Sequence, residues 1–170
     1  MVKVALTREE GNNEKLVKIL VSNSKLKLIE LPCIAFGTGP DIDKLSQYMT
    51  KNDLIIITSP QAASVFIDQW VSIGKPAVKV VSVGKGTSKP LESMGLTPVF
   101  EPSDATGETL AEELPTTLGN SVLYPSSSLA DNKLTDILTS RGFQVSNTQY
   151  TSLSFLHPSS YKISVATTCM

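Results

Sequence analysis

Short runs of aliphatic and β-branched residues alternate along the chain with longer segments that carry apolar residues at helical spacing. Residues 54–57 are four apolar residues in succession, which is typical of a strand covered by helices on both faces. The runs predict strands at residues 2–6, 26–31, 54–57, 78–83, 97–100, 122–124 and 143–150. The periodic segments predict helices at residues 12–22, 41–49, 61–71, 87–94, 106–114 and 129–140.

This alternation predicts an α/β fold. Its connections are short, so we expect right-handed parallel crossovers and a flavodoxin-like sandwich of helix, sheet and helix. Residues 39–148 contain five of the apolar runs and predict a five-stranded parallel sheet. Gly37, Gly39 and Pro40 give residues 33–40 the composition of a linker. Residues 151–170 show no helical period and, apart from 163–166, no strand pattern, so we expect a poorly ordered tail.

Composition narrows the functional classes. A length of 170 residues suits one domain, or one domain and part of another. The hydrophobic content of 41% is ordinary for a folded protein, and the net charge of −1 is nearly balanced. It has no basic stripe for nucleic acid, and no apolar run nears the roughly 18 residues needed to span a bilayer. Because a strand pattern starts at residue 2, no signal or transit peptide is expected. Cys33 and Cys169, two cysteines without a motif, indicate a reducing compartment. Together with His157, the only histidine, they do not favour a metal site.

Four turn loops are the most informative feature of the sequence. Each follows an apolar run, precedes a helical segment, and is rich in hydroxyls and glycine. They are residues 58–60, 84–87, 103–107 and 124–128. In a parallel sheet such loops lie at the carboxyl ends of the strands, where ligands bind. Exposed N–H groups at helix starts favour anions, so the loops predict a site that holds a polyanion with backbone amides and hydroxyls.

The order of the motifs resembles the uroporphyrinogen-III synthase family from residue 2 to about residue 152. The matching motifs are Thr7-Arg8, Leu31-Pro32, Thr58-Ser59-Pro60, Val83-Gly84 with Thr87, Thr106 with Leu110, Leu123-Tyr124-Pro125, Gly142 with Val145, and Tyr150-Thr151. The family's linker motif is Tyr-x-Thr, so the last match differs by one position. The amino-acid sequence at residues 113–115 and 121–125 is most similar to the plant branch of the family.

The resemblance implies two α/β lobes joined by a two-stranded linker, the first lobe being built from both ends of the chain. It predicts an incomplete first lobe at residues 1–32, a linker at 33–38, a complete flavodoxin-like lobe at 39–148, and a linker strand with a divergent tail at 149–170. Truncation before the rest of the first lobe, in a splice form or a terminated product, would explain this tail. We therefore expect little synthase activity from residues 1–170 alone.

The resemblance also implies a chemistry. The family cyclises hydroxymethylbilane, a polyanionic linear tetrapyrrole, to uroporphyrinogen III with inversion of ring D and loss of water; such enzymes are lyases that need no cofactor or metal. Tyr150 becomes the candidate catalytic residue. The candidate substrate-binding residues are Arg8, Thr58, Ser59, Gly84, Thr87, Thr106, Pro125 and Ser126. The resemblance also implies a monomer that works close to hydroxymethylbilane synthase. The similarity to plant sequences implies a chloroplast location, and without it the location would be cytoplasmic.

Several of these candidate site residues are also consistent with a purely structural role. Tyr150 is equally consistent with a strand-edge residue whose ring packs on the core. Thr87, Ser59 and Ser126 are also consistent with helix caps, and Thr58 with the end of a buried strand. Arg8 is consistent with a surface residue paired with a neighbouring glutamate. Phe66 and Trp70, four residues apart on one helix, are expected in the core.

Other functions remain open at this stage. A non-catalytic flavodoxin-like module or isoform that binds a tetrapyrrole or a protein partner fits the same pattern. A receiver-like or sugar-binding domain fits less well, because Thr58-Ser59 occupies the place of a receiver's phospho-acceptor aspartate. Lys85 lies between two glycines without the spacing of a nucleotide P-loop, so we set that function aside.

Overall fold

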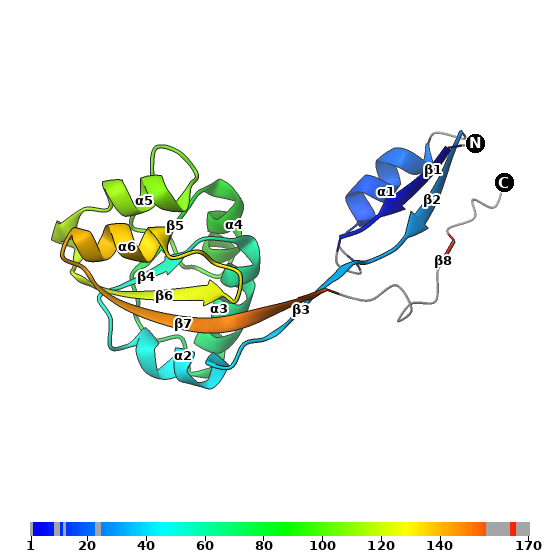
Figure 1. Cartoon of the computed structure of the whole chain (residues 1–170). Helices are drawn as coiled ribbons and strands as arrows, with labels where there is room; N and C mark the ends of the chain where they lie inside the picture. The colour runs from blue at the N-terminus through cyan, green and yellow to red at the C-terminus, as the bar shows by residue number, and fades with distance from the viewer. Residues whose placement is uncertain (1, 9–10, 12, 23–24, 156–163, 166–170) are drawn as a thin grey trace. The chain divides into compact units, whose positions relative to one another are not determined.

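The computed structural model describes residues 2–8, 11, 13–22, 25–155 and 164–165, and the chain divides into two compact units. One unit is Thr38–Ser152, and the other combines Met1–Gly37 with Leu153–Met170. The described strands form two sheets, with the orders β1-β2-β8 and β3-β7-β6-β4-β5 (Figure 1). The boundary between the units falls within β3 and β7, so these two strands carry the chain from one unit to the other.

The smaller unit is a strand–helix–strand segment with one added strand. Its elements are β1 (Val2–Leu6), α1 (Glu14–Val21), β2 (Leu26–Glu30) and β8 (Ser164–Val165). Strand β1 pairs with β2 in parallel, from Val2 opposite Leu26 to Leu6 opposite Glu30. Strand β8 pairs antiparallel with β2. The parallel β1–β2 pair requires a crossover, and α1 supplies it.

The larger unit continues the alternation of strands and helices. Its elements are β3 (Ile34–Thr38), α2 (Ile42–Met49), β4 (Leu54–Ile57), α3 (Pro60–Ser72), β5 (Val80–Ser82), α4 (Lys85–Ser93), α5 (Gly107–Glu113), a 3₁₀ turn (Thr116–Leu118), β6 (Ser121–Ser127), α6 (Lys133–Ser140) and β7 (Gln144–Phe155). Strands β5, β4, β6 and β7 are parallel neighbours in that order. This confirms the predicted α/β class with a parallel sheet.

Helices cover both faces of this sheet, as predicted. On one face α2, α3 and α4 bury a core cluster that includes Leu45, Phe66, Trp70 and Leu91. On the other face α5 and α6 bury a second cluster that includes Leu110 and Leu138. Residues of β4 alternate between the two clusters, Leu54 and Ile56 joining the second and Ile55 and Ile57 the first. A strand that is buried on both faces accounts for the unbroken apolar run.

The fifth strand of the sheet corrects the sequence prediction. Residues 97–100 form only an isolated parallel bridge, between Phe100 and Val81. Pro98 has no backbone N–H to donate to a ladder, which limits how far this segment can pair. The fifth strand is instead β3, which lies beside β7 and comes from the segment that glycine and proline had suggested was a linker.

Three boundaries after residue 120 were also wrong. Residues 124–127 of the predicted loop 124–128 belong to β6, which pairs with β7 from Ser121 to Ser127. Helix α6 accordingly begins at Lys133 rather than at residue 129. Strand β7 continues to Phe155, so the first residues of the predicted tail are strand. Of the rest of that tail only β8 is described, and His157 and Cys169 lie outside the described residues.

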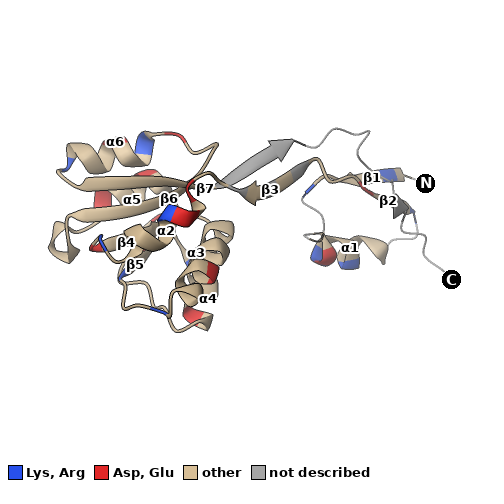
Figure 2. Cartoon of the chain, turned by 90° about the horizontal axis from the view of Figure 1, so that it is seen from below, with Lys and Arg blue, Asp and Glu red and all other residues tan. Residues whose placement is uncertain are grey.

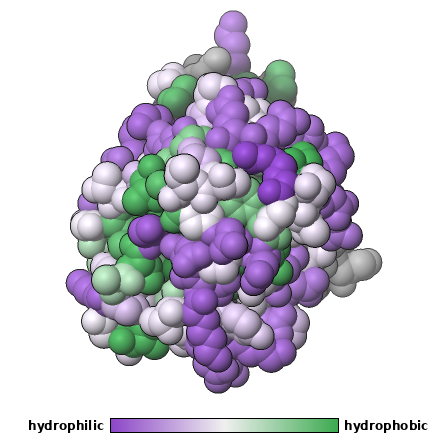
Figure 3. Space-filling view, turned by 90° about the vertical axis from the view of Figure 1, so that its left-hand side faces the viewer, coloured by the Kyte–Doolittle hydropathy of each residue, from purple (hydrophilic) through white to green (hydrophobic). Residues whose placement is uncertain are grey.

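The surface of the larger unit is of mixed charge. Lysines and arginines are interspersed with acidic residues over its helices rather than gathered in a stripe (Figure 2). The end that lies to the left in Figure 1 carries mainly hydrophilic side chains, with hydrophobic ones in small groups between them (Figure 3). In the part of the chain that the structure describes, no helix has the length and apolar character to cross a membrane.

Candidate functional site

The parallel sheet has its topological switch point between β4 and β6. From β4 the chain winds outward through β5 to the bridge at Phe100, and it then returns to the other side of β4 as β6. In the pairing of β4 with β6, Leu54 lies opposite Val122 and Ile55 lies opposite Leu123. The pairing of β6 with β7 continues as far as Ser127. The two strands are therefore paired only near their starts. A crevice at the carboxyl ends of strands that part in this way is where open α/β sheets bind ligands.

A pocket of about 460 Å³ lies at this point. Its size is within the range of small-molecule sites, roughly 300–1,000 Å³. Its walls come from the end of β4, from β6, and from the starts of α5 and α6. The lining residues are Thr58, Thr106, Gly107, Glu108, Tyr124, Ala130, Asp131, Lys133 and Leu134. All of them belong to the larger unit, so the pocket is complete within one folded body.

A phenol occupies the sheet side of this pocket. Tyr124 is only 6% exposed, and its side chain forms a hydrogen bond with that of Thr58. Burial raises the pKa of the Tyr124 phenol, the Thr58 hydrogen bond opposes the rise, and the charge of Asp131 adds to it. Burial therefore favours the protonated form of this phenol. Thr58 follows β4 directly, which brings its hydroxyl to the phenol.

The helix side of the pocket carries two carboxylates and one ammonium group. The Lys133 ammonium pairs with the Glu108 carboxylate at 2.8 Å, across the starts of α6 and α5. That hydrogen bond and the Glu108 charge raise the pKa of Lys133, and the Asp131 charge adds to the effect. The Asp131 carboxylate accepts the backbone N–H of Lys133 at 3.2 Å and so satisfies a donor of the first turn of α6. The lining side chains carry a net charge of −1 at neutral pH, from two carboxylates and one ammonium group.

A match to a known family model assigns this chain to a family. The family model described as uroporphyrinogen-III synthase HemD matches residues 14–150. The chain belongs to the uroporphyrinogen-III synthase family. It is 40% identical over 162 residues to a protein from Oryza sativa subsp. japonica named uroporphyrinogen-III synthase, chloroplastic, with 89% of this chain and 53% of the rice protein covered. The resemblance found in the sequence is thereby confirmed.

More distant relatives agree. A protein from Ruminiclostridium josui named porphyrin biosynthesis protein HemD is 25% identical over 171 residues, which cover 95% of this chain and 34% of that protein. A crystal structure of a mutant uroporphyrinogen III synthase from the extremely thermophilic bacterium Thermus thermophilus matches with a TM-score of 0.69 at 18% identity, over 90% of this chain and 63% of that one. At 18% identity the structural match supports the fold alone. The chain spans about half of the rice protein and a third of the Ruminiclostridium protein.

Of the residues predicted for the synthase site, two line the pocket. Thr58 contributes from the end of β4 and Thr106 from the start of α5. Thr106 is also the N-cap of α5, where its hydroxyl oxygen accepts the Thr109 backbone N–H at 3.1 Å. Gly84 lies beside the same loop, since a Cβ at this position would stand 3.0 Å from the Cβ of Ala105. The loops at 84–87 and 103–107 therefore meet at the carboxyl edge of the sheet.

Ser59 and Thr87 occupy helix starts in different ways. Ser59 is the N-cap of α3, and its Oγ accepts the Ala62 backbone N–H at 3.0 Å. Thr87 is not a cap, which corrects the structural alternative considered for it. Gly84 caps α4, and Thr87 lies in its first turn with only 3% of its surface exposed, donating its backbone N–H to the Gly84 carbonyl at 2.9 Å. Glycine had not been considered as the cap, so the helix start was placed too late.

Pro125 and Ser126 belong to the sheet rather than to a loop. Pro125 is buried in β6 opposite Thr148 of β7. Ser126 is 3% exposed, and its hydroxyl donates to the Asn147 side-chain oxygen at 2.8 Å. Ser126 is therefore not a helix cap. Tyr124 and Ser126 are two residues apart in a strand, so their side chains leave the same face of the sheet.

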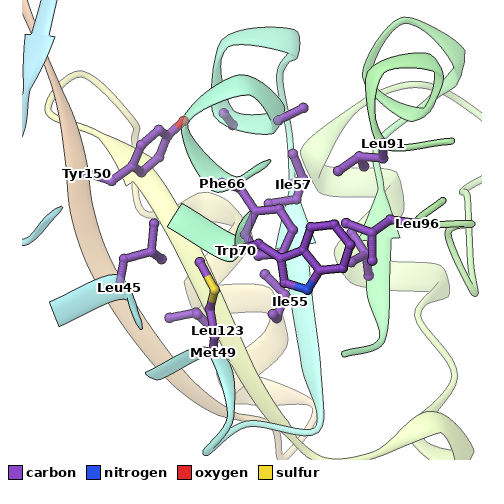
Figure 4. Close-up of a cluster of buried hydrophobic side chains, with 13 residues drawn as sticks. Leu45, Met49, Ile55, Ile57, Phe66, Trp70, Leu91, Leu96, Leu123 and Tyr150 are labelled. Atoms are coloured by element: carbon purple, nitrogen blue, oxygen red, sulfur yellow. The ribbon is translucent and has the colours of Figure 1, made fainter. Parts of the chain in front are cut away.

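Tyr150 and Arg8 lie elsewhere. Tyr150 is 3% exposed and belongs to the core cluster of Phe66 and Trp70, which confirms the predicted core placement of that pair. Figure 4 shows the Tyr150 ring at the β7 side of this cluster, with its hydroxyl directed away from Met49 and Leu123. This is the face opposite to Tyr124. Arg8 is exposed and follows β1 in the smaller unit.

Sequence analysis missed all three charged residues that line the pocket. Glu108, Asp131 and Lys133 lie at helix starts and were not considered as site residues. Tyr124 was considered only as part of the loop 124–128 and of a family motif. The Asp-Asn-Lys sequence at 131–133 was a usable signal, because Asp and Asn commonly precede helices. It lay inside the helix that had been predicted from residue 129. Among the described residues, no group of three or more His, Cys, Asp and Glu is arranged to hold a metal ion.

Proposed function

We propose that this chain serves the cyclisation of hydroxymethylbilane to uroporphyrinogen III, with inversion of ring D and loss of water, as a lyase. The observation that carries the proposal is the family match over residues 14–150. The pocket at the switch point supports it, because this is where the fold places ligands. The reaction remains a proposal for this chain, which spans about half of the rice relative.

In this proposal the carboxyl edge of the sheet holds the acetate and propionate groups of the substrate. The hydroxyls and backbone amides of the loops at 58–60, 84–87 and 103–107 would donate to them. Arg8 of the smaller unit stays a proposed contact for a substrate carboxylate. Ser59 and Thr106 would act mainly by fixing the starts of α3 and α5, since their oxygens already accept backbone N–H groups. Holding the linear substrate in a near-cyclised shape lowers the entropic barrier to ring closure.

Tyr150 keeps the proposed role of hydrogen-bond donor to the departing hydroxyl. Because Tyr150 is buried, the variant Tyr150→Phe keeps the ring in the core and removes only the hydroxyl. We expect this variant to fold as the parent does and to turn over more slowly. Unchanged turnover in the folded variant would assign Tyr150 to the core alone.

A coupled assay tests the proposal. Hydroxymethylbilane is generated in place by hydroxymethylbilane synthase, and the products are separated as type III and type I uroporphyrin after oxidation. Type III product above the no-protein control would support a synthase. Type I product alone, from uncatalysed closure, would contradict synthase activity, and saturable binding of the bilane under those conditions would favour the non-catalytic alternative.

Location and assembly are also proposals. A plastid location rests on the rice relative, whose name includes the word chloroplastic. We further propose a monomer that works close to hydroxymethylbilane synthase, because its substrate closes spontaneously. Sedimentation of the chain with and without that enzyme tests both statements, and a stable homodimer would contradict the first.

A further inference from the structure

The loops at the carboxyl edge of the larger sheet carry one positively charged side chain. Lys85 is the only lysine or arginine in the loops at 58–60, 84–87 and 103–107. It stands between Gly84 and Gly86, and a Cβ at residue 86 would meet nothing within 4 Å. The Lys85 side chain is 78% exposed. Its ammonium group therefore has room to turn toward a ligand at this edge.

A carboxylate from a neighbouring segment already holds this ammonium group. Glu101 Oε2 pairs with the Lys85 ammonium at 2.8 Å, and Glu101 Oε1 accepts a hydrogen bond from the Ser88 hydroxyl. Lys85 and Ser88 belong to the first turn of α4, whereas Glu101 leads into the loop at 103–107. The hydrogen bonds from Lys85 and from Ser88 lower the pKa of Glu101, so this carboxylate is ionised at neutral pH.

The two interactions of Glu101 differ in how readily they exchange. Ser88 is fully buried, so breaking its hydrogen bond would leave a buried hydroxyl without this acceptor. The pair with Lys85 reaches the surface, where ion pairs contribute little because water and salt compete with them. Lys85 can therefore leave while Ser88 keeps Glu101 in place. A ligand carboxylate offers Lys85 the same kind of acceptor that Glu101 does.

We propose that Lys85 binds a carboxylate of the tetrapyrrole at the carboxyl edge of the sheet, and that Glu101 competes with the ligand for this ammonium group. The inference rests on the proposed function and adds two residues to its site. Lys85 is a substrate-binding residue, and Glu101 is a positioning residue that limits how tightly the polyanion is held. Cyclisation with loss of water leaves the acetate and propionate groups unchanged, so a limited affinity for them favours product release.

A double-mutant cycle on the 170-residue chain tests the competition. Lys85→Met removes the ammonium group, and Glu101→Gln removes the charge but keeps an oxygen that can accept from Ser88. Urea unfolding followed by Trp70 fluorescence checks that each variant folds. The probe is uroporphyrin, a polycarboxylate tetrapyrrole, titrated by its own fluorescence at low ionic strength, where surface charges act most strongly.

We expect Lys85→Met to weaken uroporphyrin binding and Glu101→Gln to tighten it. The tightening should be about two- to fivefold greater in the parent than in the Lys85→Met background, which is the range of an exposed ion pair. Equal tightening in both backgrounds would show that the two charges act independently, and would overturn the proposal. Failure of the parent and of all variants to bind uroporphyrin would also overturn it.

Matched variants control for the overall change of charge. Lys89→Met on α4 and Glu112→Gln on α5 each remove one exposed charge of the same sign as the test variants. We expect their effects on uroporphyrin affinity to be small and additive. A coupling between Lys89 and Glu112 as large as that between Lys85 and Glu101 would assign the effect to net charge and contradict the competition.

The proposed function fails separately. In the coupled assay Glu101→Gln should lower the KM for hydroxymethylbilane and leave kcat unchanged, because it strengthens binding of substrate and transition state alike. If uroporphyrin shows the expected coupling but the parent yields no type III product, the competition stands and the synthase proposal falls. If type III product forms but Lys85 and Glu101 show no coupling, the synthase proposal stands and the competition falls.

Discussion

Helices α1 and α3 occupy the same place in two strand–helix–strand segments, yet they bury very different amounts of surface. Helix α3 packs Ala62, Ala63, Phe66 and Trp70 into the core of the larger unit. Helix α1 has no buried residue, and its Ile19 is 69% exposed. Both parallel strand pairs are regular, since β1 with β2 and β4 with β5 each keep a continuous register.

The difference shows that an amphipathic pattern specifies a helix but not its burial. Helix α3 lies between α2 and α4 over a five-stranded sheet, so its apolar face has neighbours on every side. The described part of the smaller unit offers α1 only a three-stranded sheet and no second helix. A small segment cannot bury enough surface to hold a core of its own. The stability of the described chain is therefore concentrated in Thr38–Ser152.

The largest effect should come from Phe66→Ala, compared with Ile19→Ala. Phe66 is fully buried, so its truncation should cost about 3–5 kcal/mol of the unfolding free energy of the larger unit. Ile19→Ala should change that free energy by less than about 0.5 kcal/mol. Urea unfolding followed by Trp70 fluorescence reports on the larger unit. A comparable loss from Ile19→Ala would show that α1 is buried in solution.

Much of this architecture could be predicted from the sequence, because its cause is local. The apolar runs at β4 and β5 and the helical periods of α2, α3 and α5 reflect a sheet covered on both faces. The errors come from pairing between distant segments. Residues 34–38 were not predicted as a strand, because Gly37 lies within them and Gly39 and Pro40 follow. They form β3 because β7 lies beside them. The same β7 extends β6 through Pro125, where proline chemistry alone suggested a turn.

The site shows the same limit. Thr58 and Thr106 were found because hydroxyls after strands and before helices form a local signal. The pocket that contains them was missed, because it depends on where β6 parts from β4 and on Glu108 meeting Lys133, which is 25 residues away in sequence. The roles of the predicted site residues stay predictions, since no ligand contact tests them.

Gly39→Ala should have a smaller but clear effect, with Gly86→Ala as its control. A Cβ at residue 39 would collide with the Gln149 carbonyl, where the Gly39 N–H donates to the Tyr150 carbonyl at 2.7 Å. We expect a loss of about 1–3 kcal/mol in unfolding free energy, the usual cost of overpacking. A Cβ at residue 86 meets nothing within 4 Å, so Gly86→Ala should be neutral or slightly stabilising. Equal effects would show that β3 and β7 separate readily at this crossing.

Ser59→Ala should cost about 1 kcal/mol, because it removes the N-cap of α3. Ser72→Ala at the other end of this helix removes an exposed hydroxyl bonded to the Gln69 carbonyl, and we expect a smaller loss. Chemical denaturation of both variants measures the difference. If Ser59→Ala leaves stability unchanged but weakens turnover, the serine acts on the substrate and not on the helix.

The smallest effect should be a loss of stability in acid, carried by the larger unit. Asp41, Asp53, Glu101 and Glu113 all lie in Thr38–Ser152, and each has a lowered pKa. A depressed pKa in the folded state gives stability that is fully present above the ordinary values of 3.8 for Asp and 4.5 for Glu. That stability is lost as the pH falls below these values and through the lower pKa of the folded state.

Asp53 gives this prediction a single-residue test. Its carboxylate accepts the backbone N–H groups of Asn120 and Ser121 at 3.1 and 3.0 Å, and these hydrogen bonds lower its pKa. Asp53→Asn should reduce stability at pH 7 and flatten the decline of stability between about pH 5 and 2, because its contribution no longer titrates. Asp68→Asn, which removes an exposed charge on α3, is the control. Melting temperatures of parent and variants that fall in parallel over this range would show that Asp53 does not anchor the start of β6 through its charge.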